Sequence, residues 1–558
     1  MRIPTVAVAV CLLVGAVEAQ VTYERIRNAS KEPHNWLTYS GTYDSHRHST
    51  LDQITPENAK DLQLQWVYQP GYVLDRGYSA TPLVVDGVMY TVQADEVVAL
   101  DAATGRIFWS YRYESNPKSK YWLKVAKGVA ILGDTIYWVA IDARLIAIDA
   151  KTGRERWNKL LADTEEGYSV TLAPLAVDNK ILVGVGTNEW GKNCWLAAHD
   201  PETGKELWRF NTIPQPGEPG HETWGGDSWK HGGAPLWVTG AYDPELNLTY
   251  WGTGNPNPGW NTDPRPGDNL YSNAVVAVDV ATGKLKWHYQ FTPGDPFDHD
   301  SVQVPVLLDA EWEGKPRKLM LWANRNGFFY VLDRATGEFL MAKAFVKQNW
   351  NTGFDEKGRP IRAPGSQSSP EGTMIQPGTQ GGTNWYSPSY SPRTGLIYVP
   401  TWDNYTSVSY SAPAKYVPGE KYAGRGGPPP GSRREVRVPA QFRKEAEGYG
   451  AIRALDPRTG EKKWEFKMPN YTEGGALTTA SDLLFGGGMD GTFVALDARS
   501  GDVLWRTNLG GTVGRSGPMT YAVNGRQYVV VPGGNSLYAF ALPESTGQLT
   551  ARDRREPR

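Results

Sequence analysis

The chain has 558 residues, with 58 Lys and Arg against 60 Asp and Glu, so its formal net charge is −2. This balance, without a basic stripe along the sequence, argues against a nucleic-acid partner. The length would allow two or three ordinary domains, but closed all-β folds often form single units of this size.

The first 19 residues have the features of an export signal. Arg2 precedes an apolar run from Val6 to Val17, and small residues lead to an expected cleavage after Ala19. No later stretch approaches 18 apolar residues, so we expect a periplasmic protein without a membrane span. Cleavage would leave Cys194 as the single cysteine, and the sequence has no Cys-x-x-Cys-His motif for a covalently attached c-type haem.

A repeated phrase, Asp-x-x-Thr-Gly-x-x-x-Trp, dominates the middle of the chain. Each copy follows a short apolar run such as Val97–Leu100, so it predicts a strand, a tight turn and a strand. Glycine suits the turn because it reaches positive φ without steric cost. The copies are Asp101–Trp109, Asp149–Trp157, Asp200–Trp208, Asp279–Trp287, Asp456–Trp464, Asp497–Trp505 with Ser500 in place of Thr, and Asp333–Met341 without the Trp.

The spacing of these copies predicts an all-β fold, an eight-bladed β-propeller over residues 20–546. A gap of 123 residues separates Asp333 from Asp456, and we expect it to contain a further blade, with Ser389–Val399 as a worn copy of the phrase. The repeated Trp residues are interpreted as rings that pack between blades rather than as ligand-stacking rings, because they recur at one position of the repeat.

Two segments differ in composition from the repeat. Residues 405–448 are rich in Pro and Gly and include a basic cluster. We interpret them as a long solvated loop in preference to a docking surface or an active-site lid. Residues 547–558 are expected to form a disordered tail.

Three segments outside the repeat carry oxygen ligands. Glu189 ends an apolar strand among glycines, and Asn255 stands before a proline. In the sequence Asp-Pro-Phe-Asp-His-Asp, an extended backbone would point Asp298 and Asp300 to the same side. Two carboxylates held together repel unless a proton or a cation lies between them. Singly these are ordinary turns, but if propeller loops bring them together, the all-oxygen set suits a hard cation and disfavours zinc or copper.

Further segments identify a family that the chain resembles. These segments are Trp224–Gly233, Tyr242–Leu248, Thr253–Pro256, Arg265–Tyr271, Ala323–Gly327 and Gly381–Trp385. With them, nearly the whole mature chain resembles the pyrroloquinoline-quinone (PQQ)-dependent alcohol dehydrogenases of the methanol and ethanol family, in their lanthanide-type form. The resemblance is specific for the class of cofactor and does not indicate which alcohol is the substrate.

The resemblance implies roles for individual residues. Glu189 and Asn255 match the family's metal ligands, and Asp298 matches the catalytic carboxylate that takes the alcohol proton and also faces the metal. Asp300 matches the additional aspartate of members that use a lanthanide(III) ion, which gains more than Ca²⁺ from a further anionic oxygen. We therefore favour a lanthanide over Ca²⁺. The cofactor contacts implied are Trp237, Arg325, Thr171, Asn384, Trp122 and Lys127.

The chain departs from the family pattern at three positions. Many members carry a vicinal disulfide over the cofactor, and Tyr121-Trp122 aligns there, where an aromatic pair could cover the quinone. Lys127 replaces a family arginine, and Ser79 replaces a family glutamate.

The predicted function is periplasmic oxidation of primary alcohols to aldehydes. PQQ would accept the hydride, the metal ion would act as a Lewis acid and Asp298 as a base. Electrons would pass to a soluble cytochrome c, and the family suggests a homodimer. The alternative is a non-enzymatic propeller scaffold of the outer-membrane assembly type, which would not require Glu189, Asn255, Asp298 or Arg325.

Overall fold

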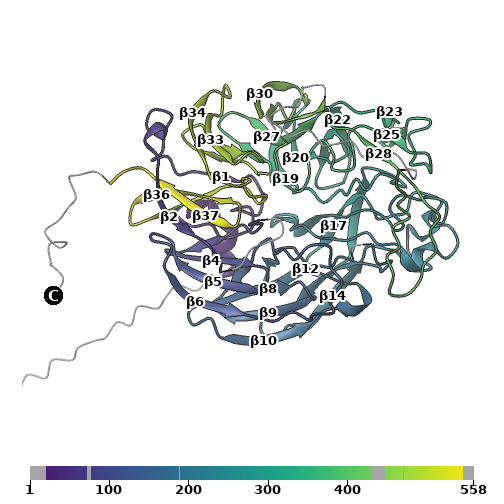
Figure 1. Cartoon of the computed structure of the whole chain (residues 1–558), viewed down its shortest axis with the longest axis horizontal. Helices are drawn as coiled ribbons and strands as arrows, with labels where there is room; N and C mark the ends of the chain where they lie inside the picture. Colours follow the sequence, from purple (N-terminus) through teal and green to yellow (C-terminus); the bar gives the residue numbers. More distant parts are fainter. Residues whose placement is uncertain (1–20, 72–76, 188, 429–446, 469–470, 545–558) are drawn as a thin grey trace, which may run out of the picture.

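The protein is an eight-bladed propeller, and this confirms the fold predicted from the sequence. The computed structural model describes residues 21–71, 77–187, 189–428, 447–468 and 471–544. Within them, eight antiparallel sheets are arranged as blades around a ring (Figure 1). The predicted export signal and C-terminal tail lie outside the described residues. No helix in the described part of the chain has the length and apolar character needed to span a bilayer.

Each blade has four strands in a simple up-and-down order, and in the first seven blades the last strand lies at the outer edge (Figure 1). The first blade consists of β3 (Leu83–Val85), β4 (Val88–Gln93), β5 (Glu96–Asp101) and β6 (Ile107–Arg112), and the second of β7 (Ala130–Leu132), β8 (Thr135–Ala140), β9 (Arg144–Asp149) and β10 (Glu155–Leu160). The third consists of β11 (Leu175–Val177), β12 (Lys180–Gly184), β13 (Trp195–His199) and β14 (Glu206–Asn211). The fourth consists of β15 (Ala241–Asp243), β16 (Leu248–Gly252), β17 (Ala274–Asp279) and β18 (Leu285–Gln290). The next three are β19 (Val306–Trp312), β20 (Lys315–Ala323), β21 (Phe328–Asp333) and β22 (Phe339–Ala344); β26 (Ser389–Ser391), β27 (Leu396–Asp403), β29 (Tyr449–Leu455) and β30 (Lys462–Met468); and β31 (Leu477–Thr479), β32 (Leu483–Gly487), β33 (Thr492–Asp497) and β34 (Val503–Asn508).

The eighth blade joins the two ends of the described chain. Its inner strands are β35 (Met519–Val523), β36 (Arg526–Gly533) and β37 (Ser536–Ala541), and its outer strand is the early strand β2 (Gln63–Tyr68). Figure 1 shows β2, in purple, beside the yellow β37. This pairing closes the ring and gives the last blade its fourth strand.

The remaining elements are short. Two-stranded sheets pair β23 (Asn351–Phe354) with β24 (Pro360–Arg362) and β25 (Thr373–Ile375) with β28 (Ser407–Ser409), and β1 (His48–Ser49) adds to β31. The helical elements are α1 (Tyr23–Arg27) and five 3₁₀ turns, η1 (Ala29–Lys31), η2 (Ala59–Asp61), η3 (Thr164–Glu166), η4 (His221–Thr223) and η5 (Ser228–His231).

The repeated Trp residues join neighbouring blades, as predicted. The ring of Trp157 lies against Gly204, in the turn of the next blade, and its Nε1 donates to the carbonyl of Pro201 at 3.2 Å. A side chain at Gly204 would meet the ring, so glycine serves both the turn, at φ 67°, and the packing. The same bond runs from Trp109 to Ala150, from Trp208 to Val280, from Trp287 to Arg334 and from Trp464 to Ala498.

The position predicted for the eighth blade is wrong, although the number of blades is right. Ser389–Val399 falls in the β26–β27 hairpin, the first hairpin of the blade that ends with the Asp456–Trp464 phrase. The long gap therefore contains no extra blade. The blade without a phrase is the eighth, where Trp66 on β2 donates from Nε1 to the carbonyl of Ala102 at 3.3 Å.

Candidate active site

All ten residues proposed from the sequence line one cavity of about 440 Å³. They come from different blades but from equivalent places. Asp298 and Asp300 precede the first strand of a blade, and Glu189 follows a second strand. The start of the first strand and the end of the second lie at the same edge of an antiparallel sheet, so the propeller gathers these loops at one end. The other lining residues from the prediction are Asn255, Trp237, Arg325, Thr171, Asn384, Trp122 and Lys127.

Arg325 links the two aspartates of the site. Its Nη1 donates to Oδ2 of Asp300 at 2.9 Å and its Nη2 to Oδ2 of Asp298 at 3.4 Å. The other oxygen of Asp300 accepts the backbone N–H of Asn255 at 2.6 Å. This contact needs Gly254, because a Cβ there would lie 2.3 Å from Asp300 Oδ1. Charge-assisted bonds of this kind fix the orientation of both carboxylates.

Two of the carboxylate residues have strained backbones. Asp298 has φ 61° and Glu189 has φ 69°, in the left-handed region that residues other than glycine seldom adopt. The extended conformation expected around Asp298 is therefore wrong, although Asp298 and Asp300 do face one group, the Arg325 guanidinium. Such strain persists only where the surroundings hold it, and it is concentrated at functional sites.

Burial and mutual repulsion disfavour ionisation of the three carboxyl groups. Burial raises the pKa of Asp298 well above its usual value, with Asp300 and Glu189 adding to the effect and Arg325 opposing it. Burial also raises the pKa of Asp300 and of Glu189. Burial lowers the pKa of Arg325, but the neighbouring aspartates outweigh this and raise it overall. The cluster therefore contains more acidic groups than its one bridging guanidinium neutralises.

The donor set fits a hard cation in its chemistry. It offers three carboxyl groups and the Asn255 amide, with no thiolate and no imidazole in the cavity lining. Within the described residues, the oxygens of Glu189, Asp298 and Asp300 do not all lie within 4.8 Å of one another.

The opposite part of the cavity is cationic and aromatic. Lys127 is buried, and its Nζ donates to Oγ1 of Thr171 at 2.7 Å. The ammonium lies 5.0 Å from the ring centre of Trp237 and 4.9 Å from that of Trp385. Burial, with a smaller contribution from Arg515, lowers the pKa of Lys127 to about 7. In the described structure this amine has no carboxylate partner, so the site fits a flat ligand that carries carboxylates.

The Tyr121-Trp122 pair is only partly in the cavity. Trp122 belongs to the lining and is 57% exposed, with Lys421 Nζ 4.4 Å from its ring centre. Tyr121 is not part of the lining. The cover predicted for the quinone therefore involves Trp122 alone in this arrangement. Ser79 lines the cavity as well, at the position of the family glutamate.

The described part of residues 405–448 is largely accessible to solvent, as interpreted from the sequence, but it also contributes to the cavity. Tyr405, Ser407 and Arg425 line the cavity, and the N–H of Tyr422 donates to the carbonyl of Glu189 at 2.7 Å. The segment therefore contributes to the wall of the cavity. Residues 429–446 lie outside the described residues.

Sequence reasoning missed an ion pair in the wall of the cavity. Arg515 donates from Nη2 to Oε2 of Glu473 at 2.5 Å, and both line the cavity. They come from the last two blades, far in sequence from the acidic segments. No motif marks them, and only the closure of the ring brings them to Lys127.

Comparisons with known proteins identify the family of the chain. Residues 36–348 and 356–529 match the PQQ family described as glucose/ethanol/alcohol dehydrogenase, beta-propeller domain. The quinohemoprotein alcohol dehydrogenase ADH-IIG of Pseudomonas putida is 38% identical over 570 residues, which cover 97% of this chain and 77% of that protein. The 1-butanol dehydrogenase (cytochrome c) of Thauera butanivorans is 36% identical over 89% of this chain and 74% of its own length.

A solved structure of a europium-containing methanol dehydrogenase superimposes with a TM-score of 0.83 at 31% identity, covering 93% of this chain and 100% of that one. The matched family spans most of the chain, and its relatives are alcohol dehydrogenases rather than scaffolds. The chain therefore belongs to the PQQ-dependent alcohol dehydrogenases and is an enzyme of that family.

Proposed function

We propose that this protein oxidises primary alcohols to aldehydes in the periplasm and passes the electrons to a cytochrome c. The observation that carries the proposal is that all ten predicted residues line one cavity. Carboxyl groups surround Arg325 in one part of it, and Lys127 supplies a cation in another part. When bound, PQQ would accept the hydride from the alcohol carbon, and a metal ion would supply Lewis acidity.

Asp298 is the residue proposed to take the hydroxyl proton. Its side chain is 17% exposed and lines the cavity, so an alcohol there can reach it. Arg325 holds the carboxylate from one side, which leaves the other oxygen available as proton acceptor. A carboxylate whose pKa is raised by burial is a stronger base once ionised, as general-base catalysis near neutral pH requires.

The cationic and aromatic side chains of the cavity are proposed to bind and orient the cofactor. Lys127 and Arg325 would pair with its carboxylates and carbonyl oxygens, and Trp237 would stack on its flat face. Thr171 and Asn384 would add neutral hydrogen bonds. The side chains of Thr171 and Lys127 already touch at 2.7 Å, so the donor set is partly preorganised.

Glu189, Asn255, Asp298 and Asp300 are proposed to hold the metal ion. Three carboxylates match the charge of a lanthanide(III) ion, and we favour it over Ca²⁺ because Asp300 adds one more anionic oxygen. The related methanol dehydrogenase with europium supports this choice.

The electron acceptor and the location are proposed from two features. A relative is named as a cytochrome c-linked 1-butanol dehydrogenase, and the 558 residues contain no Cys-x-x-Cys-His motif of their own. The Arg2-led apolar segment at residues 1–19 supports export. A homodimer remains a prediction from the resemblance.

Reconstitution tests the proposed function. The protein, purified without cofactor, is incubated with PQQ and either La³⁺ or Ca²⁺, and dye reduction is followed with a series of primary alcohols. We expect alcohol-dependent reduction that requires both PQQ and metal. A protein that binds neither PQQ nor metal and reduces no dye with any alcohol would overturn the proposal.

A further inference from the structure

The loop that presents Asp298 is built around a different aspartate, Asp295, whose side chain is fully buried. Asp295 Oδ1 accepts the N–H of Phe297 at 3.0 Å, and Oδ2 accepts the N–H of His299 at 2.9 Å. These two amides flank Asp298 on either side. One carboxylate therefore fixes the backbone immediately before and after the proposed base.

Asp295 is itself held by the connection between β16 and β17 of the preceding blade. Asn273 Nδ2 donates to Asp295 Oδ2 at 3.1 Å and to the carbonyl of His299 at 2.9 Å. Arg265, which is also fully buried, donates from Nη2 to the carbonyl of Asp295 at 2.6 Å. The carboxylate thus sits in a rigid cage of donors and has little freedom to move.

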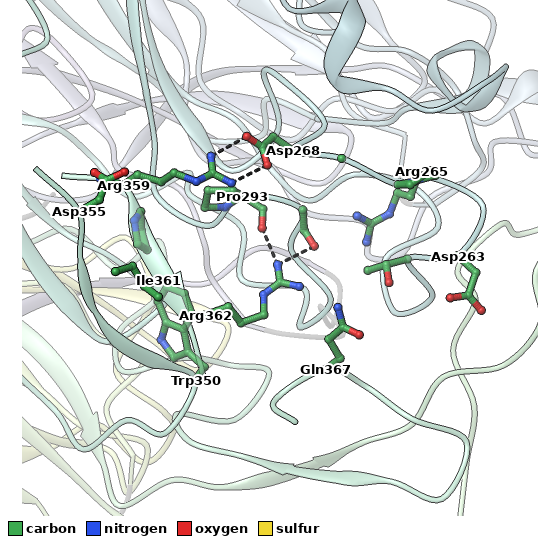
Figure 2. A pocket seen from close by; sticks show the side chains of 15 residues that line it. Asp263, Arg265, Asp268, Pro293, Trp350, Asp355, Arg359, Ile361, Arg362 and Gln367 are labelled. Carbon is green, nitrogen blue, oxygen red and sulfur yellow. Dashed lines mark hydrogen bonds and ion pairs between the residues drawn. The ribbon is translucent and has the colours of Figure 1, made fainter. Parts of the chain in front are cut away.

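The start of the loop is fixed from the outside by Arg362. Its Nη2 donates to the carbonyl of Pro293 at 2.5 Å and to that of Gly294 at 2.9 Å. Figure 2 shows Arg362 directed at Pro293 from the wall of a surface pocket of about 820 Å³, while the neighbouring Arg359 pairs with Asp268 instead. The two arginines line the same pocket, but only Arg362 bonds the loop.

This cage explains the strained backbone of the proposed base. The φ of 61° at Asp298 is unfavourable for a side chain other than glycine, so the flanking residues must be held for the conformation to persist. The bonds of Asp295 to the amides of Phe297 and His299 supply that constraint. The strained conformation directs the carboxylate of Asp298 at Arg325 and into the cavity.

We propose that Asp295 is a positioning residue for the reaction, which holds Asp298 in its strained conformation at the cavity and is supported from outside by Arg362. The inference rests on the proposed function, because it assigns Asp295 an effect on turnover through Asp298. Asp295 does not line the cavity and does not touch the reacting groups.

The first test is Asp295→Asn, in which one carboxylate oxygen becomes an NH₂ group that cannot accept an N–H. We expect kcat to fall about 10–100-fold, the size expected for misplacing a reacting group by about 1 Å, with the KM for the alcohol nearly unchanged. Asp279→Asn is the matched control, because Asp279 also accepts a backbone N–H, that of Thr282 at 2.9 Å, in a turn that carries no cavity residue. We expect its kcat to stay within about 2-fold of wild type.

A double mutant separates positioning from a general structural effect. In an Asp298→Ala background, Asp295→Asn should change the residual rate by less than about 3-fold, because residues that act through one another are not additive. A loss as large as in the wild-type background would overturn the proposal. So would wild-type kcat in folded Asp295→Asn.

Amide hydrogen exchange gives a readout that does not depend on activity. Asp295→Asn should speed exchange at Phe297 and His299, and Asp279→Asn should leave these amides as protected as in wild type. Unchanged protection would overturn the cage. If wild type is inactive but exchange at these amides is still faster in Asp295→Asn than in wild type, the result contradicts the proposed function and supports the role of Asp295 in holding the loop.

If Asp295→Asn fails to fold, Arg362→Gln replaces it, since Arg362 reaches the loop from the surface pocket. We expect a kcat loss of about 3–10-fold for Arg362→Gln and less than about 2-fold for Arg359→Gln. Equal activity of the two variants at the wild-type level would overturn the proposal.

Discussion

Two kinds of aspartate turn occur in this propeller, and their carboxylates have opposite electrostatics. In the repeated turns, Asp149 accepts the N–H and the hydroxyl of Thr152 and pairs with Arg156. Burial works against ionisation there, but these bonds outweigh it and hold the pKa of Asp149 at about 2. At Asp298 the order is reversed, and burial raises the pKa well above its usual value. The same residue type thus has a lowered pKa in the repeated turns and a raised pKa at the site.

The repeated turns and the site also differ in which residues adopt the left-handed backbone conformation. In the repeated turns the left-handed residue is a glycine, such as Gly153 at φ 71°, so the turn costs little. At the site the left-handed residues are Asp298 and Glu189, which need outside support. The repeated turns of the blades, which form the frame of the propeller, are therefore unstrained, whereas the strained residues of the site depend on contacts with that frame.

Replacing the aspartate with alanine in each kind of turn should give the largest difference in kcat. We expect Asp298→Ala to lower kcat about 10²–10⁴-fold, because it removes the proposed base. Asp149→Ala should lower the melting temperature and leave kcat within about 2-fold. Kinetics and thermal unfolding of both variants test this. Equal kcat for the two would refute the separation of frame and site.

The stability of the propeller frame should depend on its repeated Trp residues. Trp208→Ala removes a ring that packs on Gly283 and donates to the carbonyl of Val280 at 2.9 Å, so we expect a loss of about 3 kcal/mol in unfolding free energy. The matched control is Leu207→Ala on the same strand, where the side chain is 47% exposed, with an expected change within about 0.5 kcal/mol. Denaturant unfolding of the two variants measures the difference.

Asp300→Ala sharpens the comparison inside the acidic cluster. Removing this anionic oxygen should weaken La³⁺-dependent activity by about 100-fold and Ca²⁺-dependent activity by less, because the Coulomb gain grows with the charge of the ion. Reconstitution with each ion over a concentration series gives both values. Full La³⁺ activity in Asp300→Ala would sink the role of Asp300 as metal selector.

The smallest expected effect concerns pH at the cationic end of the cavity. Lys127 has a pKa of about 7 without a ligand, so below pH 7 it is already charged and PQQ affinity should be constant. Above pH 7 binding must take up a proton, and affinity should fall by up to about tenfold per pH unit. Quenching of tryptophan fluorescence by PQQ from pH 6 to 9 measures this.

Lys127→Arg is the control for the pH effect. An arginine stays protonated over this range, so the variant should bind PQQ with little pH dependence. The same slope in wild type and variant would assign the titration to another group.

The residues that could be predicted are those with a local signal. The Asp-x-x-Thr-Gly-x-x-x-Trp phrase specifies its own turn, and seven copies of its Asp-x-x-Thr/Ser-Gly core were enough to predict the propeller. Glu189, Asn255, Asp298 and Asp300 stood out because they interrupt that pattern. Trp66 escaped notice because its blade has no phrase, and Ser389–Val399 misled because any Thr-Gly hairpin has a similar local sequence.

By itself the sequence determined the seven blades that carry the repeated phrase, since strand periodicity and turn chemistry act between residues close along the chain. It also determined the types of side chain at the site. Only the tertiary structure decided that β2 closes the ring, that the 405–425 segment contributes to the cavity wall, and that Arg325 joins Asp298 to Asp300. These contacts join loops far apart in sequence, and their geometry depends on the closure of the whole ring, for which no short segment carries a signal.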